Sequence, residues 1–217
     1  GRRGEKKSMQ PFAASSIPLV TLGTFLLWFG WFGFNGFSQL AMGTFDDVNA
    51  ISKIAVNTHL AGAAGTVTGA ALTRLIGGKT DIVMMLNGAL AGLVAITAEP
   101  LTPGPITAMI IGSIGAVIMY YGTKLLENLG LDDVVGAIPV HMFAGIFGTL
   151  VVPLTNGDTS FGTQFIGVIS VCIFSFVLSW ITFSTLKSTV GLRISKAAEK
   201  QGTDKAEVGV VAYSIRD

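Results

Sequence analysis

Charged side chains are scarce in this chain of 217 residues, because Asp, Glu, Lys and Arg together make up only 12% of it. An ordinary soluble domain carries about 25% charged residues, which cover its surface in water. The scarcity excludes a typical cytosolic enzyme and a disordered chain, and we expect no enzymatic activity. The formal net charge of +1 gives no field that would steer a polyanion, which argues against a nucleic-acid-binding protein.

Cysteine and histidine are also rare. The single cysteine, Cys172, excludes an intrachain disulfide and a thiolate metal cluster. The two histidines, His59 and His141, have no carboxylate or thiol close by in the sequence, whereas a metal site usually needs three or four ligands. We therefore expect neither a metal nor another cofactor.

Apolar residues, by contrast, make up half of the chain, and the mean hydropathy is +0.65. Several apolar runs approach the ~20 residues that an α-helix needs to cross ~30 Å of hydrocarbon. These runs occupy residues 17–38, 52–73, 81–98, 105–126, 136–154 and 162–186. The sequence therefore predicts an all-α polytopic membrane protein, with a basic loop at 1–16, six transmembrane helices within 17–186 and a polar tail at 187–217. The basic start, which has no initial Met, is typical of a piece of a longer protein.

The basic residues predict how the helices are oriented in the membrane. With six spans, both ends of the chain lie on one side, and all of the 14 Lys and Arg residues except Lys53 fall on that side. Basic loops stay in the cytoplasm, so we expect a multi-pass protein of the cell (plasma or inner) membrane with a cytoplasmic C-terminus. The far side is acidic and carries Asp46, Asp47, Glu99 and Asp158.

Small residues recur at helical spacings inside the apolar runs, for example at Gly65 and Gly69 and again at Gly88 and Gly92. Lipid provides no hydrophobic drive between helices, so small faces favour the close approach of backbones. The pattern predicts a tightly packed helix bundle.

His141 is the residue that the sequence most strongly marks as functional. It lies eight residues after Asp133, or ~12 Å deeper along a helix, near the middle of a ~30 Å apolar core. An ionisable group at that depth is rare and points to function; the alternative is a neutral histidine that is hydrogen-bonded between helices. Asp133 is expected to cap the start of the helix. His59 lies near the outer end of its span and is interpreted as structural.

Aromatic residues crowd the outer end of the first span, where an interfacial belt is expected. Alternatively, Trp31 or Phe34 faces a vestibule and binds a cation through its ring face. The glycines between these aromatic residues would leave space for such an ion.

Five segments together closely resemble the ammonium transporter (Amt/Mep/Rh) family in residue type, order and spacing. They are Gly30-Trp31-Phe32-Gly33-Phe34-Asn35, Asn57-Thr58, residues 87–97, Asp132-Asp133 followed by Val140-His141, and the start of the tail at Thr189-Val190-Gly191-Leu192-Arg193. The resemblance implies an eleven-helix inverted-repeat ammonium transporter fold, assembled as a homotrimer with one pore in each subunit. The chain resembles the sixth to eleventh helices, which are the second repeat and the final helix.

The resemblance also implies roles for individual residues in the transport of ammonium or ammonia. It makes His141 the second of two facing pore histidines and a proton relay, and Phe34 one ring of the inner gate. It places Trp31 and Thr97 at the outer recruitment site and gives Asp133 and Asn87 supporting roles. The first histidine and the second gate ring belong to helices that precede this segment in the family, so the chain carries half of the site and needs the missing N-terminal half.

Two further expectations come from the same resemblance. The cytoplasmic face is expected to bind a PII-type signal protein, although the tail lacks the histidine usual after the position of Glu207. Glu99 departs from the family, which has small residues or cysteine after Ala98. Alternative functions are a membrane ammonium sensor, for which the tail is short, and a non-conducting fragment of a transporter.

Overall fold

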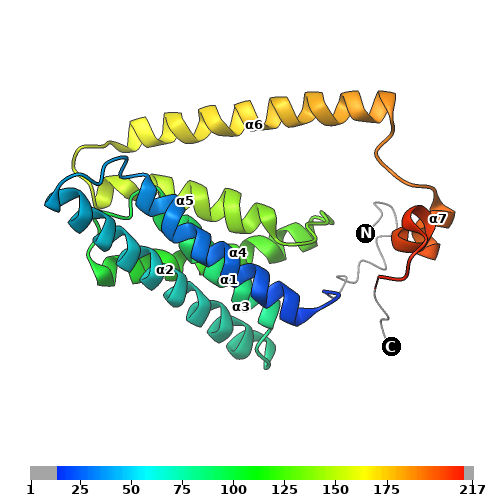
Figure 1. Cartoon of the computed structure of the whole chain (residues 1–217), viewed down its shortest axis with the longest axis horizontal. Coiled ribbons are helices and arrows are strands. Elements are labelled where there is room, and N and C mark those ends of the chain that lie inside the picture. Colours follow the sequence, from blue (N-terminus) through cyan, green and yellow to red (C-terminus); the bar gives the residue numbers. More distant parts are fainter. Residues whose placement is uncertain (1–13, 213–217) are drawn as a thin grey trace. The chain divides into compact units, whose positions relative to one another are not determined.

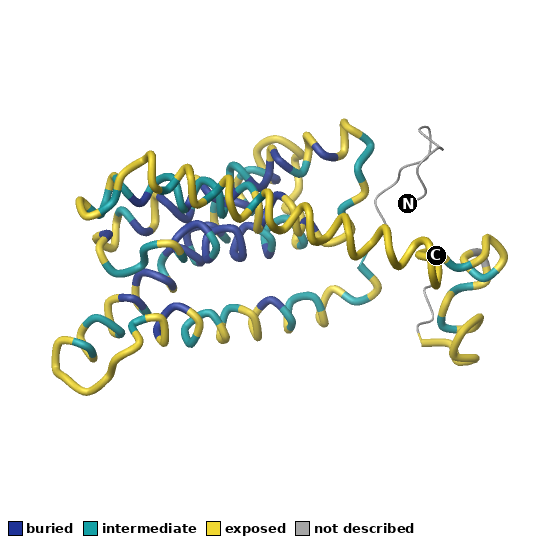
Figure 2. Tube along the Cα trace, turned by 90° about the horizontal axis from the view of Figure 1, so that it is seen from above, coloured by how far each residue is buried: buried dark blue, intermediate teal, exposed yellow. Residues whose placement is uncertain are grey.

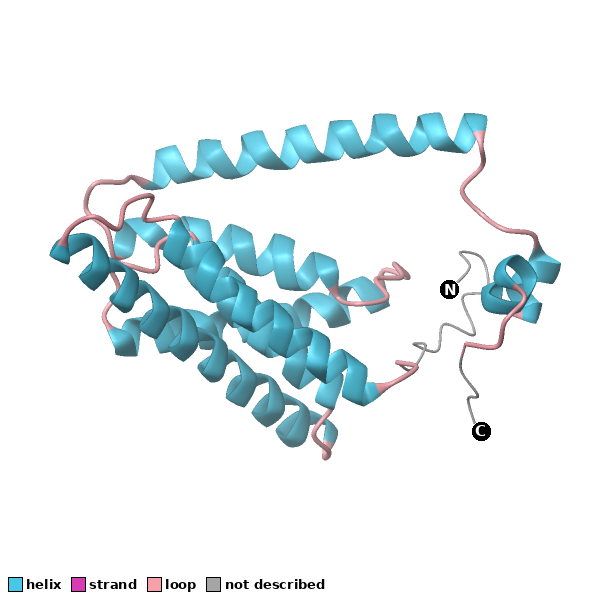
Figure 3. Cartoon of the chain, in the orientation of Figure 1, coloured by secondary structure: helices cyan, strands magenta, loops and turns pink. Residues whose placement is uncertain are grey.

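The computed structural model describes residues 14–212, most of which are helical (Figure 1, Figure 3). The described range contains no strand, and its helical elements in chain order are α1 (Ile17–Phe37), α2 (Phe45–Gly77), α3 (Ile82–Thr97), α4 (Pro105–Asn128), η1 (Ile138–Phe143), α5 (Ala144–Val151), η2 (Val152–Leu154), α6 (Phe161–Thr189), α7 (Lys196–Gln201) and η3 (Asp204–Val208). Residues 1–13 and 213–217, and with them most of the predicted basic loop and the end of the predicted tail, lie outside the described residues.

Every predicted apolar run lies in helical structure, but α2 begins at Phe45 rather than at residue 52. A capping box explains the early start: the Asp47 N–H donates to Thr44 Oγ1 (3.1 Å) and the Thr44 N–H donates to the Asp47 carboxylate (3.0 Å). The Thr44 hydroxyl also donates to this carboxylate, which lowers the pKa of Asp47. Gly78, with a φ of 75°, ends the helix in the left-handed conformation that glycine adopts without strain.

The fifth predicted span is not one regular α-helix. It starts with the π-helical turn η1, continues as α5 and ends in the 3₁₀ turn η2. Pro139 lies in the first turn, where its missing N–H leaves no helical hydrogen bond unmade. His141 therefore lies in the π-helical turn, a local irregularity that is frequent at functional sites.

Small residues bring α2, α3 and α4 into backbone contact, as the sequence predicts. A Cβ atom on Gly65 would meet the carbonyl oxygen of Gly88, and one on either Gly92 or Gly112 would meet the carbonyl oxygen of Ala61. Ala61 has no exposed surface. Most of the buried residues belong to α2, α3 and α4, and Figure 2 draws the buried residues in dark blue. The close approach replaces the large interlocking side chains of a water-soluble core.

Replacing Gly65 with alanine is expected to destabilise the bundle, because the new methyl group would overlap the backbone of α3. Overpacking of this kind costs about 1–3 kcal/mol of unfolding free energy. Gly77→Ala, in the same helix but with open space around it, provides the matched control. Thermal unfolding of the detergent-purified protein should show a lower midpoint for Gly65→Ala alone; equal midpoints for the two variants would contradict the packing.

By length and composition, three described helices could each cross a membrane, namely α1, α4 and α6, and shorter apolar helices cover Ile82–Thr97 and Ile138–Leu154. α2 is long enough, at 33 residues, but it is less apolar. Its polar residues include Asn57 and Thr58, which are both buried: Asn57 donates to the loop after α3, and Thr58 accepts from Asn35 on α1. The fold is that of a polytopic membrane protein.

The contacts divide the chain into two units, residues 1–165 and 166–217. The second unit, taken by itself, contains most of α6, followed by α7 and η3. Its last described residues fold back onto η3, where Asp204 accepts the Ala212 N–H (3.0 Å). This hydrogen bond lowers the pKa of Asp204.

Candidate functional site

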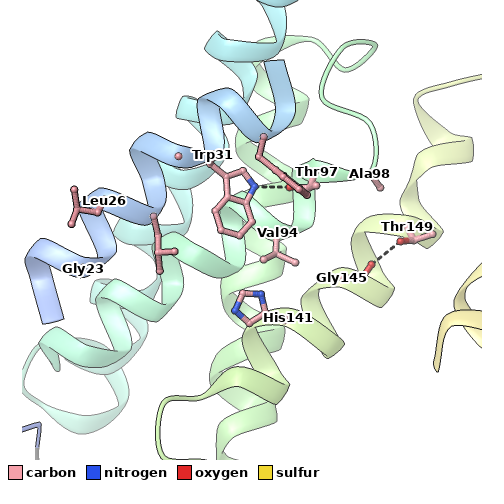
Figure 4. Close-up of a pocket in the computed structure, with 12 residues that line it drawn as sticks. Gly23, Leu26, Trp31, Val94, Thr97, Ala98, His141, Gly145 and Thr149 are labelled. Carbon is pink, nitrogen blue, oxygen red and sulfur yellow. Dashed lines mark hydrogen bonds between the residues drawn. The ribbon is translucent and has the colours of Figure 1, made fainter. Parts of the chain in front are cut away.

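A cavity of about 840 Å³ opens in the first unit between α1, α3 and the helix formed by η1 and α5 (Figure 4). Apolar surface dominates its lining. The lining residues are Gly23, Leu26, Leu27, Gly30, Trp31 and Phe34 on α1; Val94, Thr97 and Ala98 at the end of α3; and His141, Gly145 and Thr149 on η1 and α5.

Four of the six site residues named from the sequence line this one cavity. They are Trp31, Phe34, Thr97 and His141. They come from three helical segments, and Trp31 and Thr97 are 66 positions apart in the chain. The other two, Asn87 on α3 and Asp133 in the segment before η1, do not line the cavity, but both contact the chain where the helix that carries His141 begins.

The Trp31 indole is held in place by a side-chain hydrogen bond. Its Nε1–H donates to Thr97 Oγ1 at 2.7 Å (Figure 4). The Thr97 hydroxyl donates in turn to the Leu93 carbonyl oxygen at 2.7 Å. The Trp31 ring also meets the Phe34 ring edge to face, with centroids 6.0 Å apart. The indole N–H is therefore occupied, and an aromatic ring face is the group that a cation in the cavity can contact.

The His141 imidazole faces the cavity below Val94 (Figure 4). The side chain is exposed, and no hydrogen bond joins it to another described residue. The hydrogen bond between helices that the alternative interpretation expects is not formed within residues 14–212. Both ring nitrogens are available to a ligand or to a segment outside the described chain.

Asp133 and Asn87 fix the chain where the His141 helix begins. The Asp133 carboxylate accepts the N–H groups of Ala137 (2.9 Å) and Ile138 (2.7 Å), as a helix cap does. Asn87 Nδ2, on α3, donates to the Val135 carbonyl oxygen (3.1 Å). The backbone turns at Gly136, where φ is 74° and a Cβ would lie 2.7 Å from the Asn87 amide nitrogen. These contacts set the direction in which the helix enters the bundle.

His59 lies outside the cavity lining. Its ring packs against the rings of Trp28, with centroids 5.5 Å apart, and Phe32, with centroids 6.2 Å apart. Its position agrees with the structural interpretation drawn from the sequence. Among the described residues, no group of three or more His, Cys, Asp or Glu side chains could hold a metal ion.

Sequence reasoning missed part of the lining, in particular Leu27, Val94 and Thr149. Helical spacing carries a signal for them, because positions 23, 27, 30 and 34 share one face of α1, positions 94 and 97 share one face of α3, and positions 141, 145 and 149 share one face of the η1–α5 helix. Extending each face from the aromatic and histidine residues would have found these neighbours.

Comparison with known proteins gives one consistent family. The model of the family described as "Ammonium Transporter Family" matches residues 1–213. The chain is 41% identical to the ammonium transporter Amt2 of Archaeoglobus fulgidus, with 91% of the chain and 46% of the relative covered. It is 36% identical to a putative ammonium transporter of Synechocystis, with 95% and 48% covered.

Solved structures agree with the sequence relatives. A structure titled "Sensor Amt Protein" superposes with a TM-score of 0.83 at 33% identity, covering 95% of this chain and 54% of that one. Mep2 of Candida albicans superposes with a TM-score of 0.78 at 27% identity, covering 92% and 48%. The chain spans about half the length of the curated relatives that it matches.

Proposed function

The chain belongs to the Ammonium Transporter Family, and from this premise we propose that it forms one half of a membrane pathway for ammonium or ammonia. The observation that carries the proposal is the cavity, because one aromatic pair, two hydroxyls and one imidazole converge on a space whose other walls are apolar. The proposed role is transport, with no enzymatic step.

Recruitment is assigned to the outer end of the cavity. An ammonium ion entering there would meet the ring faces of Trp31 and Phe34, which attract cations through their quadrupoles. The Trp31–Thr97 hydrogen bond, at 2.7 Å, would keep the indole oriented for this contact. Phe34 is also the proposed gate ring, which an ion must pass to reach His141.

Deeper passage would favour the neutral molecule. Stripping water from an ion in an apolar space is costly, so the cavity disfavours ammonium relative to ammonia and a proton. His141, the one ionisable side chain among the described lining residues, would hydrogen-bond ammonia and accept or pass on the released proton. Asp133 and Asn87 would hold the His141 helix at the right angle for this relay.

A complete path needs residues outside this chain. The proposed relay has a second histidine and the proposed gate has a second ring, and both would come from the half of the relatives that the chain does not span. We assign the complete protein to a homotrimer in the plasma or inner membrane, with residues 187–217 in the cytoplasm and a PII-type signal protein as partner at that face. The same proposal makes residues 1–16 a cytoplasmic basic loop, residues 17–186 six transmembrane helices and residues 187–217 a cytoplasmic tail. No described residue favours sensing or a purely non-conducting role over transport.

The experiment compares two proteins in liposomes: residues 1–217 alone, and the complete protein in which a preceding half supplies the second histidine and gate ring. We expect ammonium-driven pH changes inside the liposomes from the complete protein and none above background from residues 1–217, because one wall of the path is missing. A clear ammonium-specific flux from residues 1–217 alone would disprove the half-site, and no flux from either would disprove transport.

A further inference from the structure

We propose that Glu99 is a positioning residue, whose carboxylate ties together the outer ends of two walls of the cavity and keeps the mouth in shape. The inference rests on the proposed transport function, because it concerns the same cavity. Glu99 follows Thr97 and Ala98, which both line the cavity, but it does not line the cavity itself. Its action on the mouth is therefore indirect.

The Glu99 carboxylate makes three hydrogen bonds. Oε1 accepts the N–H groups of Leu101 (3.1 Å) and Thr102 (3.2 Å), which folds the loop after α3 back toward that helix. Oε2 accepts from Asn156 Nδ2 at 2.8 Å, across 57 positions of sequence. Because charge-assisted hydrogen bonds are among the stronger ones, this pair is a firm link between two loops.

Asn156 lies two residues after η2, just beyond the end of the helix that carries His141 and Thr149. Its amide is oriented by a second contact, since Oδ1 accepts the Asp158 N–H at 2.9 Å. The Glu99–Asn156 link thus joins the end of the α3 wall to the end of the α5 wall. Thr97 on the α3 wall and Thr149 on the α5 wall both line the cavity.

A third helix holds the same loop from another side. Asn57 on α2, which is 3% exposed, donates from Nδ2 to the carbonyl oxygens of Pro100 (2.9 Å) and Pro103 (2.8 Å). A loop without regular structure is therefore fixed at several points immediately beside Thr97. This support keeps the Thr97 hydroxyl within hydrogen-bonding distance of the Trp31 indole nitrogen.

Reversing the donor and the acceptor tests the link. In the complete protein, Asn156→Asp places two carboxylates face to face, and Glu99→Gln places two amide N–H groups face to face. The double substitution restores one donor and one acceptor and leaves the Asp158 N–H with its acceptor. Asp158→Asn is the matched control, because it removes an acidic charge from the same loop, and the Asp158 side chain takes no part in the link.

Two readouts separate the link from transport itself. Hydrogen exchange of the amides in residues 98–104 should be about tenfold faster in Asn156→Asp and return to within about twofold in the double variant. The KM for ammonium uptake should rise about tenfold in Asn156→Asp, with a smaller change in maximal rate, and recover in the double variant.

Three results would overturn the proposal. Unchanged exchange in Asn156→Asp would show that the link does not hold the loop. Faster exchange with an unchanged KM would show that the link does not shape the mouth. A rise in KM for Glu99→Gln and Asp158→Asn with no rise for Asn156→Asp would assign the effect to outer charge, because the first two substitutions remove an acidic charge and the third adds one. Failure of the unsubstituted complete protein to transport ammonium would instead contradict the proposed function, with the exchange result still standing.

Discussion

Replacing His141 with alanine or aspartate is expected to reduce ammonium uptake by the complete protein about a hundredfold, a typical effect of losing a positioned proton-transfer group. His141 is the one ionisable side chain among the described residues that line the cavity, and it has no hydrogen-bond partner in the described chain. Alanine cannot carry a proton, and an aspartate is shorter, lacks the two ring nitrogens, and has an ionised form that is costly in an apolar space. Uptake by cells that depend on the protein for ammonium measures the effect.

His59→Phe is the matched control for this experiment. The His59 ring packs on Trp28 and Phe32 outside the cavity, and phenylalanine keeps an aromatic ring in that stack. Uptake should therefore stay within about twofold of that of the unsubstituted protein, because ordinary surface substitutions have only small effects on stability. Normal proton-coupled uptake in both His141 variants would remove that residue from the mechanism.

The helices and much of the site could be predicted because their signals are local. An apolar run of about 20 residues in a chain that is poor in charge has few alternatives to a membrane helix. Trp31 and Phe34 lie three positions apart, and such a spacing places two side chains on one face of a helix. Two signals predict His141, namely its expected depth eight residues after Asp133 and the resemblance of Asp132-Asp133 and Val140-His141 to the family.

The features that could not be predicted depend on contacts between distant segments. Nothing near Glu99 in the sequence indicates that its carboxylate meets Asn156. The pairing of Gly112 with the Ala61 carbonyl depends on how two helices cross. The π-helical turn at His141 depends on a shift in backbone hydrogen bonding, which a pattern of apolar residues does not record. The early start of α2 is different, because the Thr44–Asp47 capping box is a local signal that the interpretation overlooked.

Filling the cavity is expected to stop transport without disturbing the fold. Gly145 lines the cavity one helical turn after His141, and a Cβ added there would lie 3.5 Å from Val94 Cγ1, an ordinary contact distance. Gly145→Ala should therefore fold and transport almost normally. Gly145→Phe places a ring in the space between the His141 helix and Val94, and we expect uptake to fall by at least about a hundredfold, because the ring occupies the only path that the proposal allows.

Ammonium flux through the complete protein in liposomes, measured for Gly145→Ala and Gly145→Phe side by side, tests most directly whether this cavity is the transport path. Thermal unfolding of the same samples establishes that both variants are folded. The account predicts near-normal flux for Gly145→Ala and background flux for Gly145→Phe at similar unfolding midpoints. Equal flux through the two folded variants would contradict it, because ammonium would then be crossing the membrane by another route.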